Sequence, residues 1–563
     1  MEKDWHKLVS QPRYKVKVKK DIPVVMRDGI RLAADVYCPD GSGKFPALLS
    51  YSCYTKDVQK LPVSKFPSYS RMGNGGIESG DTEYFVSRGY AHVIADARGT
   101  GLSEGGYRFF AKSEQQDGYE LIEWIANQPW CNGNVGMLGM SYFGMIQYLV
   151  AALNPPHLKA IFPYEAATDI YRQWGYHGGM LNYGMPFQWW PHIPAHTIEP
   201  LDIPNSELEQ RIMEAKSKED IRSWPIVYLT LMVPQKNTQL FDFAIYPYDG
   251  PYYWERSAYT KFDQIKIPAY LVSRWNCWPL HLPGAFDAYL GLKVPKKLMI
   301  MIPEGGSAPI RPWSEHHDII LRWYDHWLKG VDTGIMGEPP IKILVQGTNE
   351  WRYENEWPLA RTKWTKFYLG EKGVLSQTPS AYSEPVDSFT NKPALWPGEK
   401  VPSLQYTTTH FPEDVEITGP LSLHLYASLS QEDTNWIAEI FDIDRDGSRR
   451  LITMGWLKAS HRECDEAKSH PYQPWHPHTR SIPVEPGKIN QYAIDLKETS
   501  NVFKAGHRLQ LIVKGQDAAW EAEMGQEYFR ANHCHLNNTK ETKHQLYHTP
   551  EFQSHLFLPL VPR

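Results

Sequence analysis

The chain has 563 residues, too many for one ordinary domain, so we expect roughly two to four domains. A hydrophobic content of 42% and a charged content of 22% are typical of globular proteins with a sizeable core. The net charge of −5 is small for this length and no basic stripe is visible, which argues against nucleic acid as a partner.

Targeting and cofactor signals are absent from the sequence. No run of about 18 apolar residues occurs, so we expect no membrane-spanning helix and no membrane partner. The first residues contain no apolar segment of secretory type, and the six cysteines do not have metal-type spacing. We therefore expect a cytoplasmic protein with reduced thiols, no metal and no other cofactor.

Residues 1–164 predict the first part of an α/β core. Residues 14–37 alternate polar and apolar side chains around a turn, which predicts an antiparallel hairpin. Apolar runs at 45–51, 89–95 and 135–138 predict buried strands, and the periodicity over 117–128 predicts a helix before the last of them. Strands that are apolar throughout and alternate with helices are typical of a mostly parallel sheet.

The segment 135–144, Val-Gly-Met-Leu-Gly-Met-Ser-Tyr-Phe-Gly, predicts a nucleophile elbow with Ser141 at its apex. A buried strand precedes the serine and a helix-compatible apolar segment follows it. Small residues flank such a turn because its backbone segments approach closely. The second glycine lies one place later than in the usual Gly-x-Ser-x-Gly pattern. The alternative is a glycine-rich turn with an idle serine.

The remaining chain divides into three predicted parts. Residues 165–255 are rich in Trp, Tyr, His and Pro and predict a cap inserted between strands of the sheet. Residues 256–340 return to the core, with strands at 267–273 and 297–302 and a closing helix at 318–328. Residues 341–563 contain short β runs separated by turns, which predicts a jelly-roll β-sandwich.

Several motifs together resemble the family of cocaine esterase, X-prolyl dipeptidyl aminopeptidases and glutaryl-cephalosporin acylases. They are Met26-Arg27-Asp28-Gly29, Asp96-Ala97-Arg98-Gly99-Thr100-Gly101, Gln128-Pro129-Trp130, the segment from Gly136 to Tyr142, the segment from Leu321 to Gly330, and Ala505-Gly506-His507-Arg508-Leu509. The resemblance covers nearly the whole chain. It implies an α/β-hydrolase core, a mainly helical cap and a C-terminal all-β jelly-roll domain, in agreement with the pattern analysis.

The resemblance also implies roles for three residues. Ser141 stands where the family has its nucleophile, and Tyr54 stands where the family has a tyrosine that donates into the oxyanion hole. The backbone N–H of Tyr142 would be the second donor, since attack on a carbonyl builds negative charge that two fixed donors stabilise. The alternative for Tyr54 is an aromatic residue of a surface loop.

The acid and the base of the triad depart from the family pattern. Where the family has its Asp, after the strand at 267–273, this sequence has Cys277. Where the family has its His, after the next strand, this sequence has Gly306. Removal of the base from a serine triad costs on the order of a millionfold in turnover. Ordinary esterase or peptidase turnover therefore does not follow from the resemblance.

The first hypothesis is that a relocated relay restores hydrolysis of a small-molecule ester, lactone or amide. His281 lies four residues after Cys277, and Glu304 lies at the tip of the next strand. The two strand ends should be neighbours, so a relay of Ser141, His281 and Glu304 is geometrically conceivable. The alternative for His281 is a packing or surface residue.

Two further hypotheses stay open. The oxyanion hole and an aromatic pocket could serve a non-hydrolytic reaction of secondary metabolism, such as a condensation, elimination, isomerisation or cycloaddition. The protein could also be an inactive ligand-binding pseudo-hydrolase. Candidate walls of the substrate pocket are Trp174, Trp275, Asn276 and Cys277, with core packing as the alternative. Jelly-roll faces often form subunit interfaces, so a homodimer is also open.

Overall fold

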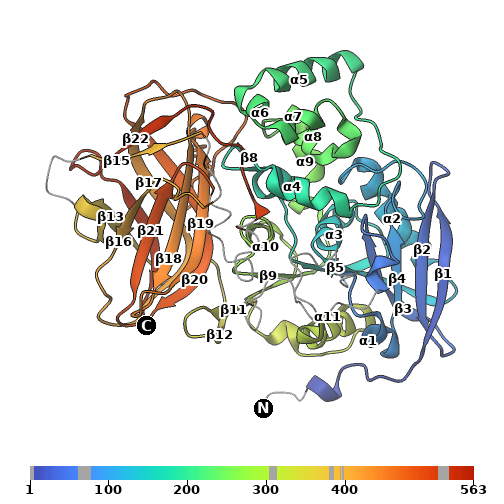
Figure 1. Cartoon of the computed structure of the whole chain (residues 1–563). Coiled ribbons are helices and arrows are strands. Elements are labelled where there is room, and N and C mark those ends of the chain that lie inside the picture. The colour runs from blue at the N-terminus through green and yellow to red at the C-terminus, as the bar shows by residue number, and fades with distance from the viewer. Residues whose placement is uncertain are drawn as a thin grey trace.

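The computed structural model describes residues 5–60, 78–302, 313–379, 386–393, 395, 398–517, 530 and 532–562. An α/β core carries an inserted cap of mostly short helices, and an all-β domain follows it in the chain (Figure 1). The predicted fold class is confirmed. Within the described residues, no helix combines the length and apolar character that a bilayer crossing requires.

The core is built on a sheet of ten strands in the order β1-β2-β4-β3-β5-β6-β9-β10-β11-β12. The strands from β4 to β11 in this order run parallel, and the outer strands β1, β2 and β12 pair antiparallel. Their bounds are β1 (Val16–Val25), β2 (Arg31–Pro39), β3 (Phe45–Ser52), β4 (Ala91–Asp96), β5 (Cys131–Met140), β6 (Leu158–Tyr164), β9 (Ala269–Arg274), β10 (Lys296–Met301), β11 (Ile341–Val345) and β12 (Glu350–Glu354).

Helices cover both faces of this sheet. Leu48 of β3 packs in the cluster formed with α1 (Thr82–Ser87) and α11 (His317–Lys329), whereas its neighbours Ala47 and Leu49 pack with the opposite cluster. That second cluster includes α2 (Lys112–Ala126), α3 (Tyr142–Ala152) and α10 (Leu282–Gly291). Successive strand side chains point to opposite faces, so a strand covered on both faces must be apolar throughout.

The cap lies between β6 and β9 and consists of short elements. Its helices and strands are η4 (Tyr171–Gly175), β7 (Tyr176–His177), β8 (Met180–Leu181), α4 (Gly184–Trp189), η5 (Trp190–His192), α5 (Asn205–Ser217), α6 (Glu219–Ser223), α7 (Pro225–Thr230), η6 (Pro234–Lys236), α8 (Thr238–Ile245), α9 (Pro251–Arg256) and η7 (Tyr259–Gln264). Proline begins or interrupts several of them, because it cannot donate a backbone hydrogen bond within a helix. Figure 1 shows α4 to α9 gathered on one side of the core.

The C-terminal domain is a sheet of eleven strands. They are β13 (Lys363–Gly370), β14 (Val374–Ser376), β15 (Asp387–Asn391), β16 (Ser403–Thr407), β17 (Val415–Leu429), β18 (Asn435–Ile443), β19 (Arg449–Lys458), β20 (Asn490–Phe503), β21 (Arg508–Lys514), β22 (Thr542–Tyr547) and β23 (His555–Val561). One part of the sequence analysis needs correction here. The run Ile341–Val345, assigned to the β-sandwich, is β11 and pairs with β10 in the core sheet. This pairing corrects the assignment of one strand. The boundary between the core and the C-terminal domain, which the sequence analysis put between residues 340 and 341, stays a prediction.

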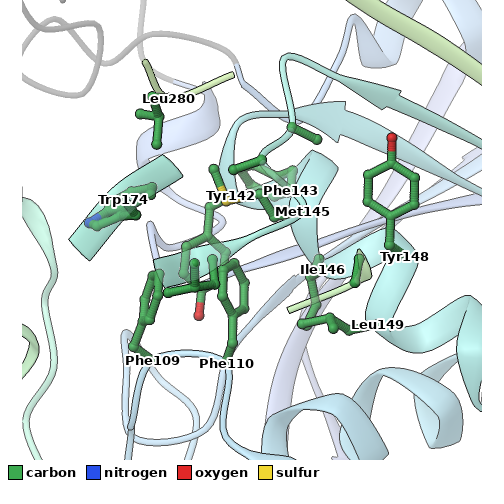
Figure 2. Packing of buried hydrophobic residues seen from close by; sticks show 14 of the residues in the cluster. Phe109, Phe110, Tyr142, Phe143, Met145, Ile146, Tyr148, Leu149, Trp174 and Leu280 are labelled. Carbon is green, nitrogen blue, oxygen red and sulfur yellow. The ribbon is translucent and has the colours of Figure 1, made fainter. Parts of the chain in front are cut away.

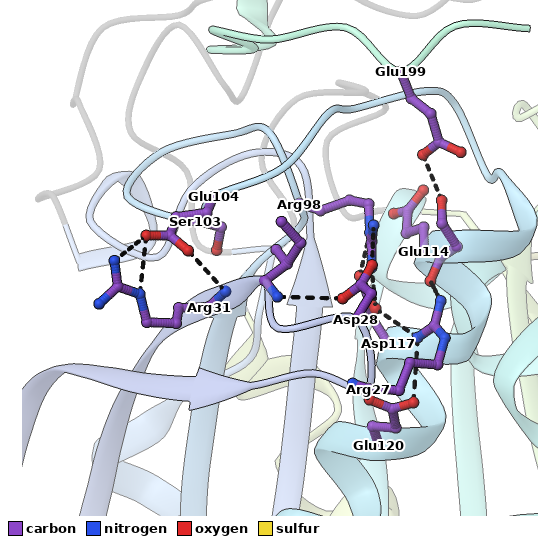
Figure 3. Close-up of polar contacts among 12 residues, drawn as sticks. Arg27, Asp28, Arg31, Arg98, Ser103, Glu104, Glu114, Asp117, Glu120 and Glu199 are labelled. Atoms are coloured by element: carbon purple, nitrogen blue, oxygen red, sulfur yellow. Dashed lines mark hydrogen bonds and ion pairs between the residues drawn. The ribbon is translucent and has the colours of Figure 1, made fainter.

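Two motifs that carry the family resemblance meet in a buried ion-pair cluster beside α2 (Figure 3). Arg98 donates to both carboxylate oxygens of Asp117, each at 2.6 Å, and to Asp28 at 3.1 Å. Arg27 donates to Asp117 at 3.0 Å. Asp117 is fully buried, so its charge depends on these guanidinium partners. The cluster ties the β1–β2 turn and the end of β4 to α2.

We predict that Arg98→Met lowers the free energy of unfolding by about 3–5 kcal/mol, because it leaves a buried carboxylate short of its main partner. Chemical denaturation followed by circular dichroism measures this change. Arg31→Met is the matched control, since Arg31 pairs with Glu104 in solvent, and its loss of stability should be much smaller. Equal losses in the two variants would contradict the prediction.

Candidate active site

Ser141 occupies the sharp turn between β5 and α3. Its backbone lies at φ 56° and ψ −119°, a strained conformation for a residue with a side chain that costs about 1–3 kcal/mol. A Cβ at Gly139 would lie 2.3 Å from Cβ of Phe143, and one at Gly144 would lie 2.8 Å from the carbonyl oxygen of Tyr164. The second small residue is therefore required at position 144 in this turn. These are the features of a nucleophile elbow.

The structure brings His281 to Ser141. His281 immediately precedes α10, close after the end of β9, and its side chain is buried. Its Nε2 lies 3.4 Å from Oγ of Ser141. This separation is longer than an ideal hydrogen bond, as is common in sites without a substrate. The side chains of His281 and Ser141 are therefore in contact. The role of His281 as the base remains a proposal.

A carboxylate that the sequence analysis did not select lies on the other side of the imidazole. Glu165 follows β6 directly, is fully buried, and has its Oε2 3.6 Å from Nδ1 of His281. The backbone of Glu165 has a φ of 47°, in the left-handed region. Both residues that flank the His281 imidazole, Ser141 and Glu165, therefore have strained backbones. The selected acid, Glu304, lies outside the described residues. Since β5, β6 and β9 are neighbours in the sheet, their carboxyl ends place Ser141, Glu165 and His281 together.

Arg274, the last residue of β9, holds the Glu165 carboxylate in place. Its Nε pairs with Oε1 of Glu165, and its Nη2 donates to Oε2 at 3.2 Å. Both side chains are buried. Burial opposes the charged guanidinium, but electrostatic interactions with the neighbouring Cys277 and Glu165 outweigh it and raise the pKa of Arg274 above its ordinary value. This pairing with a charged arginine fixes the orientation of the two carboxylate oxygens of Glu165.

Tyr54 is buried beside the serine rather than on a surface loop. Burial raises the pKa of Tyr54 well above its ordinary value, and hydrogen bonds with Trp189 and Ser141 oppose that rise only in part. The indole Nε1–H of Trp189 donates to the Tyr54 hydroxyl at 2.8 Å. A phenol that accepts this bond has its own proton available for another acceptor. Tyr142 is the first residue of α3, where backbone N–H groups have no acceptor within the helix.

The side chain of Tyr142 is anchored below the elbow. Its hydroxyl donates to the two carboxylate oxygens of Glu114 at 2.7 and 2.8 Å, and it accepts a bond from Tyr107 at 3.3 Å. Figure 2 shows the Tyr142 ring among Phe109 and Phe110 at the start of α3. Burial raises the pKa of Glu114 to about 8. Packing and hydrogen bonds together therefore fix Tyr142 at the start of α3.

The predicted pocket walls separate into two groups. Trp174 packs against Trp189, with ring centroids 5.2 Å apart, and so adjoins the residue that contacts Tyr54. Trp275 instead packs in the core, where its indole donates to the carbonyl of Leu344 at 2.7 Å. Asn276 beside it is half-buried. The placement of Trp275 corresponds to the core-packing alternative.

Cys277 joins the Ser141 site from the same turn as His281. The amide of His281 donates to the carbonyl of Cys277 at 2.9 Å, so the two side chains lie one turn apart on the same side. Glu165, Cys277 and His281 each offer a potential ligand atom, and these atoms lie within 4.8 Å of one another. Among the described residues, this is the one His, Cys, Asp or Glu group with the geometry to hold a metal ion.

The sequence analysis did not select four residues of this site: Glu165, Arg274, Trp189 and Glu114. A signal existed only for Glu165, which is a carboxylate at the carboxyl end of the strand next to the elbow strand. It was assigned to the first position of the cap. Trp189 and Glu114 approach the site through tertiary packing alone, and their local sequence carries no pattern that distinguishes them.

A serine held at a strained turn between a central parallel strand and a helix is the arrangement of α/β-hydrolases, and this chain has that fold. Residues 28–305 match the family described as X-Pro dipeptidyl-peptidase (S15 family), and residues 333–557 match the X-Pro dipeptidyl-peptidase C-terminal non-catalytic domain. The chain belongs to this family and is a hydrolase-family enzyme.

Known relatives are similar to this chain in sequence over most of its length. Cocaine esterase from Rhodococcus sp. (strain MB1 Bresler) is 27% identical over 97% of this chain and 99% of its own length. A putative Xaa-Pro dipeptidyl-peptidase from Bacillus anthracis is 23% identical over 87% of this chain and 81% of its own length. The crystal structure of a CocE/NonD family hydrolase from Staphylococcus aureus matches with a TM-score of 0.77 and 25% identity, covering 97% of this chain and 94% of that chain.

We predict that Glu114→Gln removes a loss of stability that the wild type shows as pH rises from about 4.5 to about 8. The pKa of Glu114 is raised from 4.5 to about 8 by burial, so between these values the folded chain binds more protons than the unfolded chain. Wild-type stability should therefore fall as pH rises through this range, and the variant should lack that part of the fall. Thermal melts at several pH values measure it. Exposed Glu83→Gln is the control, and an unchanged pH dependence in Glu114→Gln would contradict the prediction.

Proposed function

We propose that this enzyme hydrolyses small-molecule esters, lactones or amides through Ser141, with His281 as the general base and Glu165 as the acid of a relocated triad. The observation that carries the proposal is the contact of His281 with both partners, Nε2 with Ser141 at 3.4 Å and Nδ1 with Glu165 at 3.6 Å. The three side chains therefore have the order that nucleophilic catalysis requires.

The relay differs from the family arrangement by one strand. The resemblance places the nucleophile after β5, the acid after β9 and the base after β10. Here the acid follows β6 and the base follows β9. Both groups have moved one strand toward the nucleophile, and they still reach it because parallel strands end at a common edge. This shift explains how Cys277 can stand at the family's Asp position in a working hydrolase.

The proposed reaction proceeds through an acyl-enzyme. Oγ of Ser141 attacks the carbonyl carbon while Nε2 of His281 takes its proton, and Glu165 stabilises the imidazolium that forms. The imidazolium then gives the proton to the leaving alcohol or amine. A water molecule, deprotonated by the same imidazole, hydrolyses the acyl-enzyme and regenerates Ser141. Arg274 keeps Glu165 ionised throughout, and without it the carboxylate would be a buried, poorly paired charge.

The proposed oxyanion hole consists of the Tyr54 hydroxyl and the backbone N–H of Tyr142. Trp189 supports this assignment, because its indole N–H occupies an acceptor position on the Tyr54 oxygen and leaves the phenol proton for the developing oxyanion. The high pKa of Tyr54 keeps that proton in place at neutral pH. The relatives are named esterases and dipeptidyl-peptidases, so aryl and alkyl esters are the first substrates to test, followed by amides and X-Pro peptides.

Labelling by a fluorophosphonate, followed by intact mass, tests the relay. We expect rapid single-site labelling of the wild type and its loss in Ser141→Ala and His281→Ala. Turnover of a reactive ester should fall on the order of 10⁶-fold in these two variants and about 10⁴-fold in Glu165→Gln.

Glu304→Gln is the matched control for the acid. If it abolishes turnover while Glu165→Gln does not, then Glu304 is the acid and the relocation proposed here is wrong. If the wild type labels no faster than Ser141→Ala, the serine is not activated. The non-hydrolytic hypothesis, or that of an inactive binder, then replaces hydrolysis.

We predict that Tyr54→Phe lowers kcat by about 10²–10³-fold with a much smaller change in KM, because the lost hydrogen bond forms fully only in the transition state. Steady-state kinetics with an ester separate the two constants. Tyr183→Phe, a cap tyrosine that packs on Trp224, is the control. A proportional rise in KM without a fall in kcat would show that Tyr54 binds the substrate rather than the oxyanion.

A further inference from the structure

The group Glu165, Cys277 and His281 combines a carboxylate, a thiol and an imidazole in one buried position. All three side chains are buried, and their potential ligand atoms lie within 4.8 Å of one another. They come from two neighbouring strand ends, Glu165 from β6 and the other two from the turn after β9. The hydrolytic mechanism uses Glu165 and His281 and leaves the Cys277 thiol without a role.

The chemistry of the three groups fits one class of ligand. Thiolate, imidazole and carboxylate are the ligands of tetrahedral Zn²⁺ sites, and thiolate selects zinc-like cations over Mg²⁺ and Ca²⁺. Bonds of about 2.0–2.3 Å separate the ligand atoms of such a site by roughly 3.3–3.7 Å. Separations of up to 4.8 Å therefore require a contraction of up to about 1.5 Å, which side-chain rotations can supply. A water molecule would complete the tetrahedron.

The surrounding charges permit such a cation and limit its affinity. Arg274 pairs with Oε1 of Glu165 and repels a dication, but its positive charge also favours the thiolate form of Cys277. Binding converts Cys277–SH and M²⁺ into a Cys277–S–M⁺ unit and one free proton, so no oxidant or other reactant is needed. Oε2 faces His281 and is the carboxylate oxygen that would bind the cation, in competition with Nη2 of Arg274, which donates to it at 3.2 Å.

We propose that Glu165, Cys277 and His281 form a site for a zinc-like divalent cation, and that occupation of this site reversibly switches off the hydrolase. The inhibitory part rests on the proposed function, since the cation would engage the acid and the base of the relay. With the cation on Nδ1 of His281, the ring proton stays on Nε2, so Nε2 cannot accept the proton of Ser141, and Glu165 no longer stabilises the imidazolium. Ser141 keeps its place but loses its base.

Cadmium is the probe, because a cadmium–thiolate bond has an ultraviolet charge-transfer band that reports binding without any reference to activity. The metal-free protein is titrated with Cd²⁺, and bound metal is counted after desalting. We expect one Cd²⁺ per chain with the band present, inhibition of ester turnover at the same concentrations, and recovery with EDTA. Mg²⁺ and Ca²⁺ should neither bind nor inhibit.

Two variants locate the site, and one controls for other thiols. Cys277→Ser should abolish binding of the inhibitory Cd²⁺ and its charge-transfer band. Inhibition of each variant is measured relative to the turnover of the same variant without metal. Glu165→Gln keeps the thiol and should weaken Cd²⁺ binding at least about 10-fold, which holds the test open if Cys277→Ser does not fold. Cys464→Ser is the control, because Cys464 also lies near a histidine, with Sγ 3.7 Å from Nδ1 of His476, and it should respond to Cd²⁺ as the wild type does.

The outcomes separate this proposal from the proposed function. An active wild type that neither binds nor responds to Cd²⁺, or one whose response persists in Cys277→Ser, overturns the cation site. A Cd²⁺ band that depends on Cys277 in a protein without ester turnover supports the site and removes hydrolysis. A band that depends on Cys277 without loss of turnover overturns the inhibitory role.

Discussion

The buried carboxylate of Glu165 is the constraint on which this site depends. A charge in the interior is tolerated only with partners, and Glu165 has Arg274 on one side and His281 on the other. Its own backbone is strained, and the amide of Glu165 is held by the carbonyl of Val272 at 2.7 Å. The ion pair therefore fixes the ends of β6 and β9 relative to each other, and the elbow after β5 stands beside them.

The same principle operates beside α2. Asp117 is buried and is neutralised by arginines from two motifs that carry the family resemblance (Figure 3). Those motifs are therefore structural in this chain, since they join the β1–β2 turn and the end of β4 to α2. Glu114, one turn earlier on α2, anchors Tyr142 at the elbow. One helix thus connects the ion-pair cluster to the proposed oxyanion hole.

Family membership and catalytic arrangement are separate properties here. The chain matches its relatives over almost its whole length, and we propose that two residues of the family's triad are nevertheless absent from their places. A fold supplies a set of strand ends at one edge, and different strand ends can present the same functional groups. The relocated relay that we propose uses this freedom. It also leaves a thiol, Cys277, where the family has its acid, and this substitution underlies the proposed cation site.

The sequence by itself determined the fold class, the elbow at Ser141 and the inserted position of the cap, because these depend on local periodicity and turn chemistry. It also offered His281 as a candidate base, with a packing or surface residue as the alternative. Only the tertiary structure decided that Glu165 is the carboxylate at the imidazole and that Trp189 binds Tyr54. It also moved β11 from the β-sandwich to the core sheet. Such contacts join segments far apart in the chain, and no local pattern encodes which strand ends become neighbours.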